Sequence, residues 1–124
     1  MFASKTVELA GRCVLIVEDD YHAAEDLSAI VREWQGVVVG PVPTVGEALA
    51  LVDSGEKVDA AILDINLGGE KVFPVAEALK AIGIPIIFVT GYDNWMIPQE
   101  YEDTPVLRKP AEADNVVHLL FGRM

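Results

Sequence analysis

Five side chains that could bind a metal ion or a phosphate follow apolar runs of the sequence. They are, in chain order, Glu18, Asp19, Asp64, Thr90 and Lys109. Continuous apolar runs bounded by turn residues are typical of strands that are buried on both faces of a parallel sheet. Because ligands of open α/β sheets bind at the carboxyl ends of the strands, we expect these side chains to meet at one edge of a sheet.

Three of the five side chains are carboxylates, which would repel one another at neighbouring strand ends and raise one another's pKa values. A hard divalent cation relieves this repulsion, and Mg²⁺ prefers oxygen ligands while it keeps several waters. We expect Asp19 and Asp64 to bind Mg²⁺ directly and Glu18 to act through a water. The backbone carbonyl of Asn66 completes the ligands that the protein supplies.

A hydroxyl and an ammonium group beside such a metal centre suit a phosphoryl group. Thr90 can donate a hydrogen bond to a phosphate oxygen, and Lys109 can pair first with Asp64 and then with the transferred phosphate. Asp64 is then the nucleophile, and the product is an aspartyl phosphate.

Apolar strand patterns alternate with helical patterns along the chain, which is typical of right-handed βαβ units. We predict a flavodoxin-like (βα)5 three-layer sandwich, an α/β fold with a parallel five-stranded sheet in the order 2-1-3-4-5. The predicted strands are Arg12–Val17, Gly36–Gly40, Val58–Asp64, Ile84–Thr90 and Val106–Arg108. The predicted helices are Tyr21–Gln35, the segment between Thr44 and Ser54, Lys71–Ile82 and Glu112–Gly122.

Local signals predict where these helices begin and end. Asp20 is a plausible N-cap of the first helix, and Gly36 is its expected C-terminal stop. Thr44 and Glu47 have the spacing of a capping box. Pro74 is compatible only with the first turn of the third helix.

Prolines predict two irregular stretches. Pro41 and Pro43 should end the second strand at Gly40, because proline donates no hydrogen bond to a ladder. The stretch Gly91–Thr104 also contains proline, and we predict a partly ordered loop with at most a turn or two of helix, so that the fourth helix is short or disordered.

Spacing also predicts which side chains are buried. Cys13 lies in an apolar run, which favours a buried and inert thiol, and Trp34 should lie in the core. Val116, Leu119 and Leu120 should face inward from the last helix.

Three aromatic residues of the stretch Gly91–Thr104 each have two possible roles. Tyr92 either overhangs the site and limits water access or is a partly buried loop residue. Trp95 and Tyr101 either pack inward or mark a partner surface.

Composition limits the classes of partner. The formal net charge of −11 disfavours nonspecific binding to nucleic acid and to anionic membranes. The apolar stretches are too short to span a bilayer, and polar residues interrupt the N-terminus where a signal peptide would have an apolar core. We expect a cytoplasmic protein with one domain over residues 1–124, of which 1–11 form an N-terminal tail.

The chain resembles a two-component response regulator receiver domain over nearly its whole length, on the residues Glu18-Asp19, Asp64, Thr90 and Lys109-Pro110. The resemblance implies that Asp64 accepts a phosphoryl group from a sensor histidine kinase, with Mg²⁺ as cofactor. The resemblance also implies that the protein is not an enzyme, except that it assists its own phosphorylation and dephosphorylation with Mg²⁺. Because the sequence ends soon after the last helix, we expect no output domain. Its output would be protein contact, transfer to a relay protein, or service as a phosphate sink.

A narrower resemblance lies in the segment Pro85–Tyr92, which is similar to the Pro-Phe-x-Phe-Ala-Thr-Gly-Tyr motif of the FAT GUY receivers, with departures at Ile86 and Val89. That subgroup implies alphaproteobacterial signalling and a kinase of the HWE or HisKA2 type. Val106 and Ala111 stand where common receivers carry aromatic residues, which puts the usual switch between threonine and an aromatic side chain in question.

Two other functions compete with this interpretation. A metal-dependent phosphohydrolase could also use Asp64 as nucleophile, but haloacid-dehalogenase-like enzymes carry an acid two residues later, where this chain has Asn66. The second alternative is an adaptor whose acidic residues only bind a cation.

Overall fold

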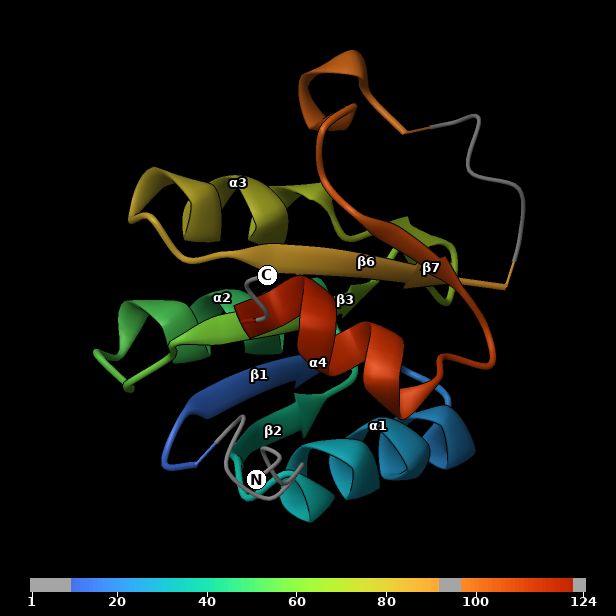
Figure 1. The fold of residues 1–124 in the computed structure, drawn as a ribbon. Coiled ribbons are helices and arrows are strands. Elements are labelled where there is room, and N and C mark those ends of the chain that lie inside the picture. Colours follow the sequence, from blue (N-terminus) through green and yellow to red (C-terminus); the bar gives the residue numbers. More distant parts are fainter. Residues whose placement is uncertain (1–9, 92–96, 122–124) are drawn as a thin grey trace.

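The computed structural model describes residues 10–91 and 97–121. A central sheet lies between two helical layers, as Figure 1 shows. The elements, in chain order, are β1 (Cys13–Val17), α1 (Tyr21–Glu33), β2 (Val37–Val42), α2 (Val45–Asp53), β3 (Ala60–Asp64), β4 (Asn66–Leu67), β5 (Glu70–Lys71), α3 (Phe73–Ala81), β6 (Ile86–Thr90), the 3-10 helix η2 (Gln99–Tyr101), β7 (Val106–Arg108) and α4 (Ala113–Phe121).

The main sheet has the strand order β2-β1-β3-β6-β7, and all its neighbouring strands run parallel. This order confirms the predicted flavodoxin-like fold. The register pairs Val17 with Leu63, Asp64 with Val89, and Thr90 with Arg108. The carboxyl ends of four strands therefore lie side by side at one edge.

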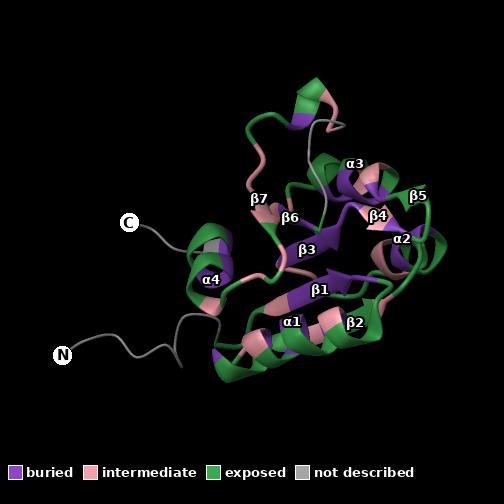
Figure 2. Cartoon of the chain, turned by 90° about the vertical axis from the view of Figure 1, so that its right-hand side faces the viewer, coloured by how far each residue is buried: buried purple, intermediate pink, exposed green. Residues whose placement is uncertain are grey.

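Alternation along the buried strands gives each face of the sheet its own core. Leu15 and Val17 of β1 face the core that α2 and α3 cover, and Val14 and Ile16 face the core under α1 and α4. Figure 2 shows β1 and β3 mostly buried, whereas the outer sides of the helices are exposed. Two-sided burial explains why these strands have continuous apolar sequences.

The prediction that β2 ends at Gly40 is wrong. The strand continues to Val42, with a cis peptide bond between Gly40 and Pro41 and a register shift against β1. The carbonyl of Val42 still accepts a hydrogen bond from the Glu18 N–H at 3.0 Å. Proline is tolerated here because β2 is an edge strand, where one side of the backbone needs no partner strand.

The predicted helix caps are confirmed at the N-termini and corrected at one C-terminus. A carboxylate oxygen of Asp20 accepts the His22 N–H at 2.8 Å, and the Thr44 hydroxyl oxygen accepts the Glu47 N–H at 3.1 Å. At the end of α1, however, Gln35 takes the left-handed conformation (φ 70°), not Gly36. The backbone needs that conformation directly after the cap residue, which is one position earlier than the glycine.

Helix α3 begins at Phe73, two residues later than predicted, with Pro74 in its first turn as expected. The residues before it, Asn66–Lys71, form a small antiparallel hairpin of β4 and β5. Its turn places Gly68 and Gly69 at φ values of 62° and 97°, which glycine adopts without steric cost. The hairpin follows Asp64 closely and forms one wall of the cleft described below.

Two burial predictions are also wrong. Leu119 of α4 is 38% exposed, although its neighbour Leu120 is buried, because adjacent helical residues point about 100° apart. Cys13 is only half-buried, since it is the first residue of β1, at the margin of the sheet.

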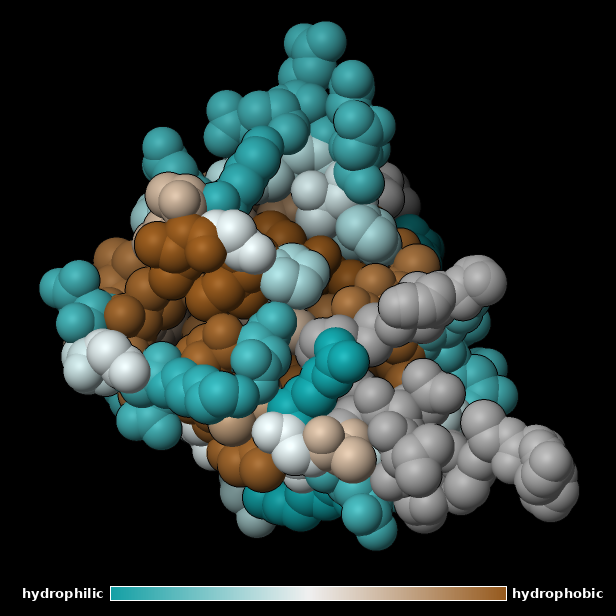
Figure 3. Space-filling view, turned by 60° about the vertical axis from the view of Figure 1, so that its left-hand side comes forward, coloured by the Kyte–Doolittle hydropathy of each residue, from teal (hydrophilic) through white to brown (hydrophobic). Residues whose placement is uncertain are grey.

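Figure 3 shows hydrophobic residues gathered on a face at the end where the strands begin, and Ile82, just after α3, is 61% exposed. Within the described ranges, no helix has the length and apolar character to cross a membrane.

Between β6 and β7, the described residues contain only the three-residue helix η2. This agrees with the prediction of a much shortened fourth helix. Tyr101 packs inward and is 2% exposed, which decides one of the open alternatives. Tyr92 and Trp95 lie outside the described residues.

Candidate functional site

A cleft of about 420 Å³ opens at the carboxyl edge of the sheet. It is lined by Asp19, Asp20, Asp64, Asn66, Gly68, Gly91 and Lys109, and we call it the carboxylate cleft. Strands β1, β3, β6 and β7 end around it, so one edge gathers residues that are up to 90 positions apart in sequence.

Three acidic side chains converge at this cleft. Glu18, Asp19 and Asp64 each offer a carboxylate oxygen, and these oxygens lie within 4.8 Å of one another. Glu18 and Asp64 are buried, whereas Asp19 is exposed toward solvent. Three hard oxygen donors at this spacing, one of them open to water, could hold a small divalent cation such as Mg²⁺.

Lys109 reaches into the same group from the end of β7. Its Nζ lies 2.8 Å from Glu18 Oε1 and 3.2 Å from Asp64 Oδ2. Its backbone N–H donates to the Thr90 carbonyl at 2.9 Å, which fixes where the side chain leaves the sheet. Burial lowers the pKa of Lys109, but the hydrogen bonds and charges of the two carboxylates outweigh burial and leave the pKa raised. The lysine is therefore a permanent cation in the cleft.

The carboxyl of Asp64 has an unusual proton affinity. Burial, followed by the neighbouring Glu18 carboxylate, raises the pKa of Asp64 to about 7, although Lys109 acts in the opposite direction. Without further positive charge, a large fraction of Asp64 is protonated at neutral pH. A second cation beside Lys109 would favour the ionised form that a nucleophile requires.

The two remaining predicted site residues frame Asp64. Thr90 is buried at the end of β6, and its carbonyl accepts the Lys109 N–H. The Asn66 N–H donates to Asp64 Oδ1 at 3.3 Å, while the side-chain oxygen of Asn66 accepts the Gly69 N–H at 2.9 Å and closes the hairpin. The structure thus brings all the predicted site residues to one edge of the sheet.

Sequence reasoning missed the role of Gly68 in shaping the cleft. A Cβ atom at this position would lie 3.6 Å from Asp19 Oδ2, within van der Waals contact of a candidate metal ligand. The positive φ favours glycine as well. The Gly-Gly pair was the only sequence signal, and it indicated a turn rather than a wall of the site.

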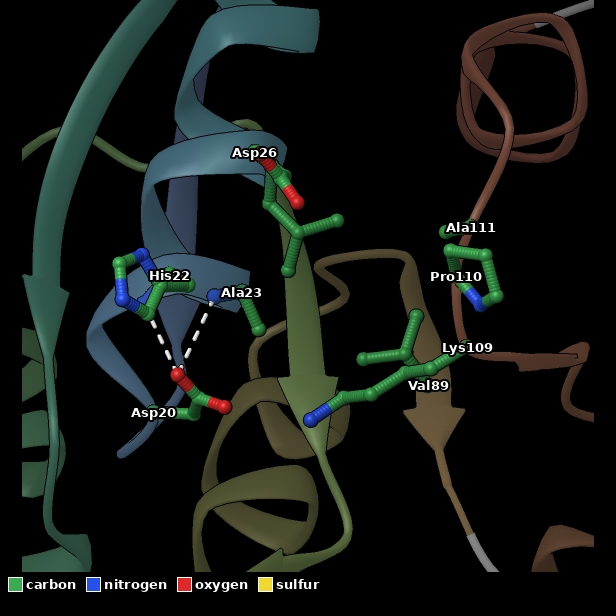
Figure 4. A pocket seen from close by; sticks show the side chains of 9 residues that line it. Asp20, His22, Ala23, Asp26, Val89, Lys109, Pro110 and Ala111 are labelled. Carbon is green, nitrogen blue, oxygen red and sulfur yellow. Dashed lines mark hydrogen bonds between the residues drawn. The ribbon is translucent and has the colours of Figure 1, made fainter.

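A second concavity was also missed, because it forms between segments far apart in sequence. This Pro110 pocket, of about 360 Å³, is lined by Asp20, His22, Ala23, Asp26, Leu27, Val89, Lys109, Pro110 and Ala111. Figure 4 shows the first turn of α1 facing Pro110 and Ala111 across it, with the Lys109 side chain extending toward Asp20. Lys109 and Asp20 line both concavities, so the pocket adjoins the carboxylate cleft.

Comparisons with known proteins agree with this geometry. The family model for the response regulator receiver domain matches residues 14–120. The solution structure of SdrG from Sphingomonas melonis Fr1 is 45% identical, with a TM-score of 0.78, and the match covers 91% of this chain and 94% of SdrG. A BeF3-activated conformation of SdrG from Pseudomonas melonis Fr1 is 46% identical, with a TM-score of 0.73 and coverage of 90% and 94%.

One curated relative is the phyllosphere-induced regulator PhyR of Methylorubrum extorquens, which is 29% identical over 106 residues. The match covers 83% of this chain and 40% of PhyR, so the chain spans less than half the length of that relative.

Proposed function

The chain belongs to the family of response regulator receiver domains, and from that membership we propose that Asp64 accepts a phosphoryl group from a sensor histidine kinase. The observation that carries the proposal is the position of Lys109, which pairs with both Glu18 and Asp64 inside a cleft lined by carboxylates. Because Lys109 lies between Glu18 and Asp64, it can keep its contact with Glu18 while it binds a phosphoryl group newly attached to Asp64.

We propose the following roles for the residues of the cleft. An oxygen of the ionised Asp64 attacks phosphorus as the N–P bond of a phosphohistidine breaks, and the imidazole leaves. Lys109 moves from the carboxylate of Asp64 to a phosphoryl oxygen and keeps its contact with Glu18. Thr90 donates its hydroxyl hydrogen to another phosphoryl oxygen.

Mg²⁺ fits the donor set of this cleft, and when bound it supplies positive charge that lowers the repulsion between carboxylates and phosphate. We propose Asp19 and Asp64 as direct ligands, Glu18 as a ligand through water, and the Asn66 carbonyl as the remaining protein ligand.

Asp19→Asn is expected to weaken Mg²⁺ binding by roughly 10-fold to 100-fold, because a charged oxygen donor becomes neutral in an otherwise unchanged cleft. Titration of Mg²⁺ against intrinsic tryptophan fluorescence or amide resonances measures the change. Asp26→Asn is the matched control, since it removes the same charge from α1 outside the carboxylate cleft. Equal affinities for the two variants would contradict the assignment of Asp19.

The Pro110 pocket supports a protein donor of the phosphoryl group. A histidine that reaches Asp64 must belong to a protein surface that covers the rim of the cleft, and the pocket beside Lys109 gives that surface apolar side chains to pack against.

We propose a kinase of the HWE or HisKA2 type, and membership of the FAT GUY subgroup, from the segment Pro85–Tyr92. The similarity to SdrG, of which a BeF3-activated form is known, supports phosphorylation of Asp64, since beryllofluoride imitates a phosphoryl group on a carboxylate.

We propose that the signal leaves through protein contacts or by transfer to a relay protein, with a phosphate sink as the alternative. The net charge of −11 favours protein partners over nucleic acid. A phosphohydrolase is less well supported, because Asn66 has no acidic proton to give and its side chain is engaged with Gly69.

The decisive experiment is incubation with acetyl phosphate and Mg²⁺, followed by intact-mass measurement. One added phosphoryl group, lost again on treatment with hydroxylamine, is expected for an aspartyl phosphate. Absence of any label, or rapid multiple-turnover hydrolysis of small phosphomonoesters, would contradict the proposal. Incubation with candidate kinases and labelled ATP then identifies the physiological donor.

A further inference from the structure

Three aromatic rings pack together at the end of the core that α3 covers. The rings of Phe73 and Tyr101 are stacked, with centroids 5.6 Å apart and an interplanar angle of 18°. Phe88 meets both rings edge-on, at 5.5 Å from Tyr101 and 5.7 Å from Phe73. Tyr101 is nearly fully buried, although it lies in the irregular connection between β6 and β7. The ring of Tyr101 thus attaches the connection to the core, together with the partly buried Ile97.

Phe88 links this ring cluster to the end of β6. It precedes Thr90 by two residues, so the two side chains leave the same face of the strand. Close packing transmits small displacements, because a core ring cannot shift without its neighbours. The ring of Tyr101 therefore limits where the end of β6 can stand.

Phe73 links the same cluster to the hairpin on the other side of the cleft. It opens α3 directly after Val72, whose N–H donates to the Ile65 carbonyl at 3.0 Å. That bond closes the base of the hairpin that carries Asn66. Tyr101 thus contacts Phe88, which leads to Thr90, and Phe73, which leads to the hairpin with Asn66.

The contacts of Tyr101 indicate that its ring, rather than its hydroxyl, provides the hold. The hydroxyl lies 3.5 Å from the Phe73 carbonyl, which is long for a hydrogen bond, and its other partner, the side chain of Glu100, is exposed to solvent. Lys80 adds a second hold, with its Nζ 5.4 Å from the ring centroid and 3.4 Å from the Glu100 carbonyl. Loss of the hydroxyl should therefore matter much less than loss of the ring.

We propose that Tyr101 is a positioning residue for the phosphoacceptor site: its ring sets, through Phe88 and Phe73, where Thr90 and Asn66 stand relative to Asp64. The inference rests on the proposed function, because it concerns the chemistry of a phosphoryl group on Asp64. Tyr101 would then do more than fill the core, because its ring would also affect the chemistry at Asp64.

The test compares Tyr101→Leu with Tyr101→Phe and with Val39→Ala. Val39 lies in the same core but on β2, which β1 and β3 separate from β6. Tyr101→Leu is expected to change the lifetime of the phosphoryl group by about fivefold or more, as contacting residues couple this strongly. It should also move the amide resonances of Thr90 and Asn66. Tyr101→Phe should restore both readouts, and Val39→Ala should change stability alone.

Equal phosphoryl lifetimes in Tyr101→Leu and Val39→Ala, or failure of Tyr101→Phe to restore the wild-type lifetime, would overturn the inference. If the wild-type protein takes no label from acetyl phosphate, the proposed function fails, and the amide resonances of the unlabelled protein then decide the inference alone. Resonances of Thr90 and Asn66 that move in Tyr101→Leu but not in Val39→Ala support it, and unmoved resonances refute it.

Discussion

Asp64→Asn is expected to reduce labelling by acetyl phosphate or by a kinase to less than about a thousandth of the wild-type rate, because loss of a nucleophile removes the reaction path. The amide of asparagine has nearly the same shape as the carboxylate but does not attack phosphorus. Intact mass and transfer of radioactive phosphate from ATP measure the loss. Persistent labelling of the variant at the wild-type rate would place the acceptor elsewhere.

The same variant should fold normally and be more stable without metal. Asp64 and Glu18 are buried beside each other, and Lys109 serves both. Removal of one negative charge leaves one carboxylate with one lysine, which at pH 8 should raise the free energy of unfolding by on the order of 1 kcal/mol. Urea unfolding in the presence of EDTA measures this gain.

Asp59→Asn is the matched control for this result. Asp59 Oδ2 accepts the Cys13 N–H at 2.8 Å and pairs with Lys57, at the opposite end of the sheet from the cleft. The Cys13 N–H and then Lys57 lower the pKa of Asp59, so the charged form is favoured in the folded state. Its substitution should reduce stability and leave labelling intact, which is the reverse of Asp64→Asn.

The second large effect is a pH dependence of the metal-free protein. An Asp in the unfolded chain titrates near pH 3.9, whereas the pKa of folded Asp64 is about 7. Between these values the folded state binds more protons than the unfolded state, so the contribution of Asp64 to stability is fully present below about pH 4. This contribution is lost as the pH rises to about 7. We therefore expect the wild-type protein to lose stability over this window relative to Asp64→Asn.

Urea midpoints of both proteins in EDTA, measured from about pH 5 to about pH 8, check this expectation. Mg²⁺ should restore stability at the alkaline end, where Asp64 is ionised, more than at the acid end. Parallel pH profiles for wild type and Asp64→Asn would show that the environment of Asp64 does not shift its pKa.

The strand pattern and the strand-end residues could be predicted from sequence because each signal is local. The apolar run Ala60–Leu63 and the acid that ends it follow one another in the chain, and topology alone then aligns Asp64 with the ends of β1 and β6. The contact of Lys109 with Asp64 follows from the same rule, since β7 lies beside β6.

The features that were predicted wrongly, left open or missed concern residues whose conformation depends on distant neighbours. Pro41 remains in a strand because β2 lies at the sheet edge, a position that the predicted strand order already implied but that the residues around Pro41 do not show by themselves. Burial of Tyr101 required knowledge that Phe73 and Phe88 would leave a ring-sized place beside α3. The Pro110 pocket likewise exists only once α1 and the start of α4 face each other.

The small hairpin Asn66–Lys71 contains residues that can vary beside the site without a large effect on the stability of the fold. Its turn, Gly68-Gly69, and its second strand, Glu70–Lys71, are exposed, whereas Leu67 of its first strand is buried in the core, and the hairpin lies beside Asp64. Substitutions at the exposed hairpin positions could therefore change the lifetime of the phosphoryl group on Asp64 while the protein still folds. For protein engineering, the exposed positions Glu70 and Lys71 are therefore places to change the signal duration, whereas Leu67 of the same hairpin belongs to the core.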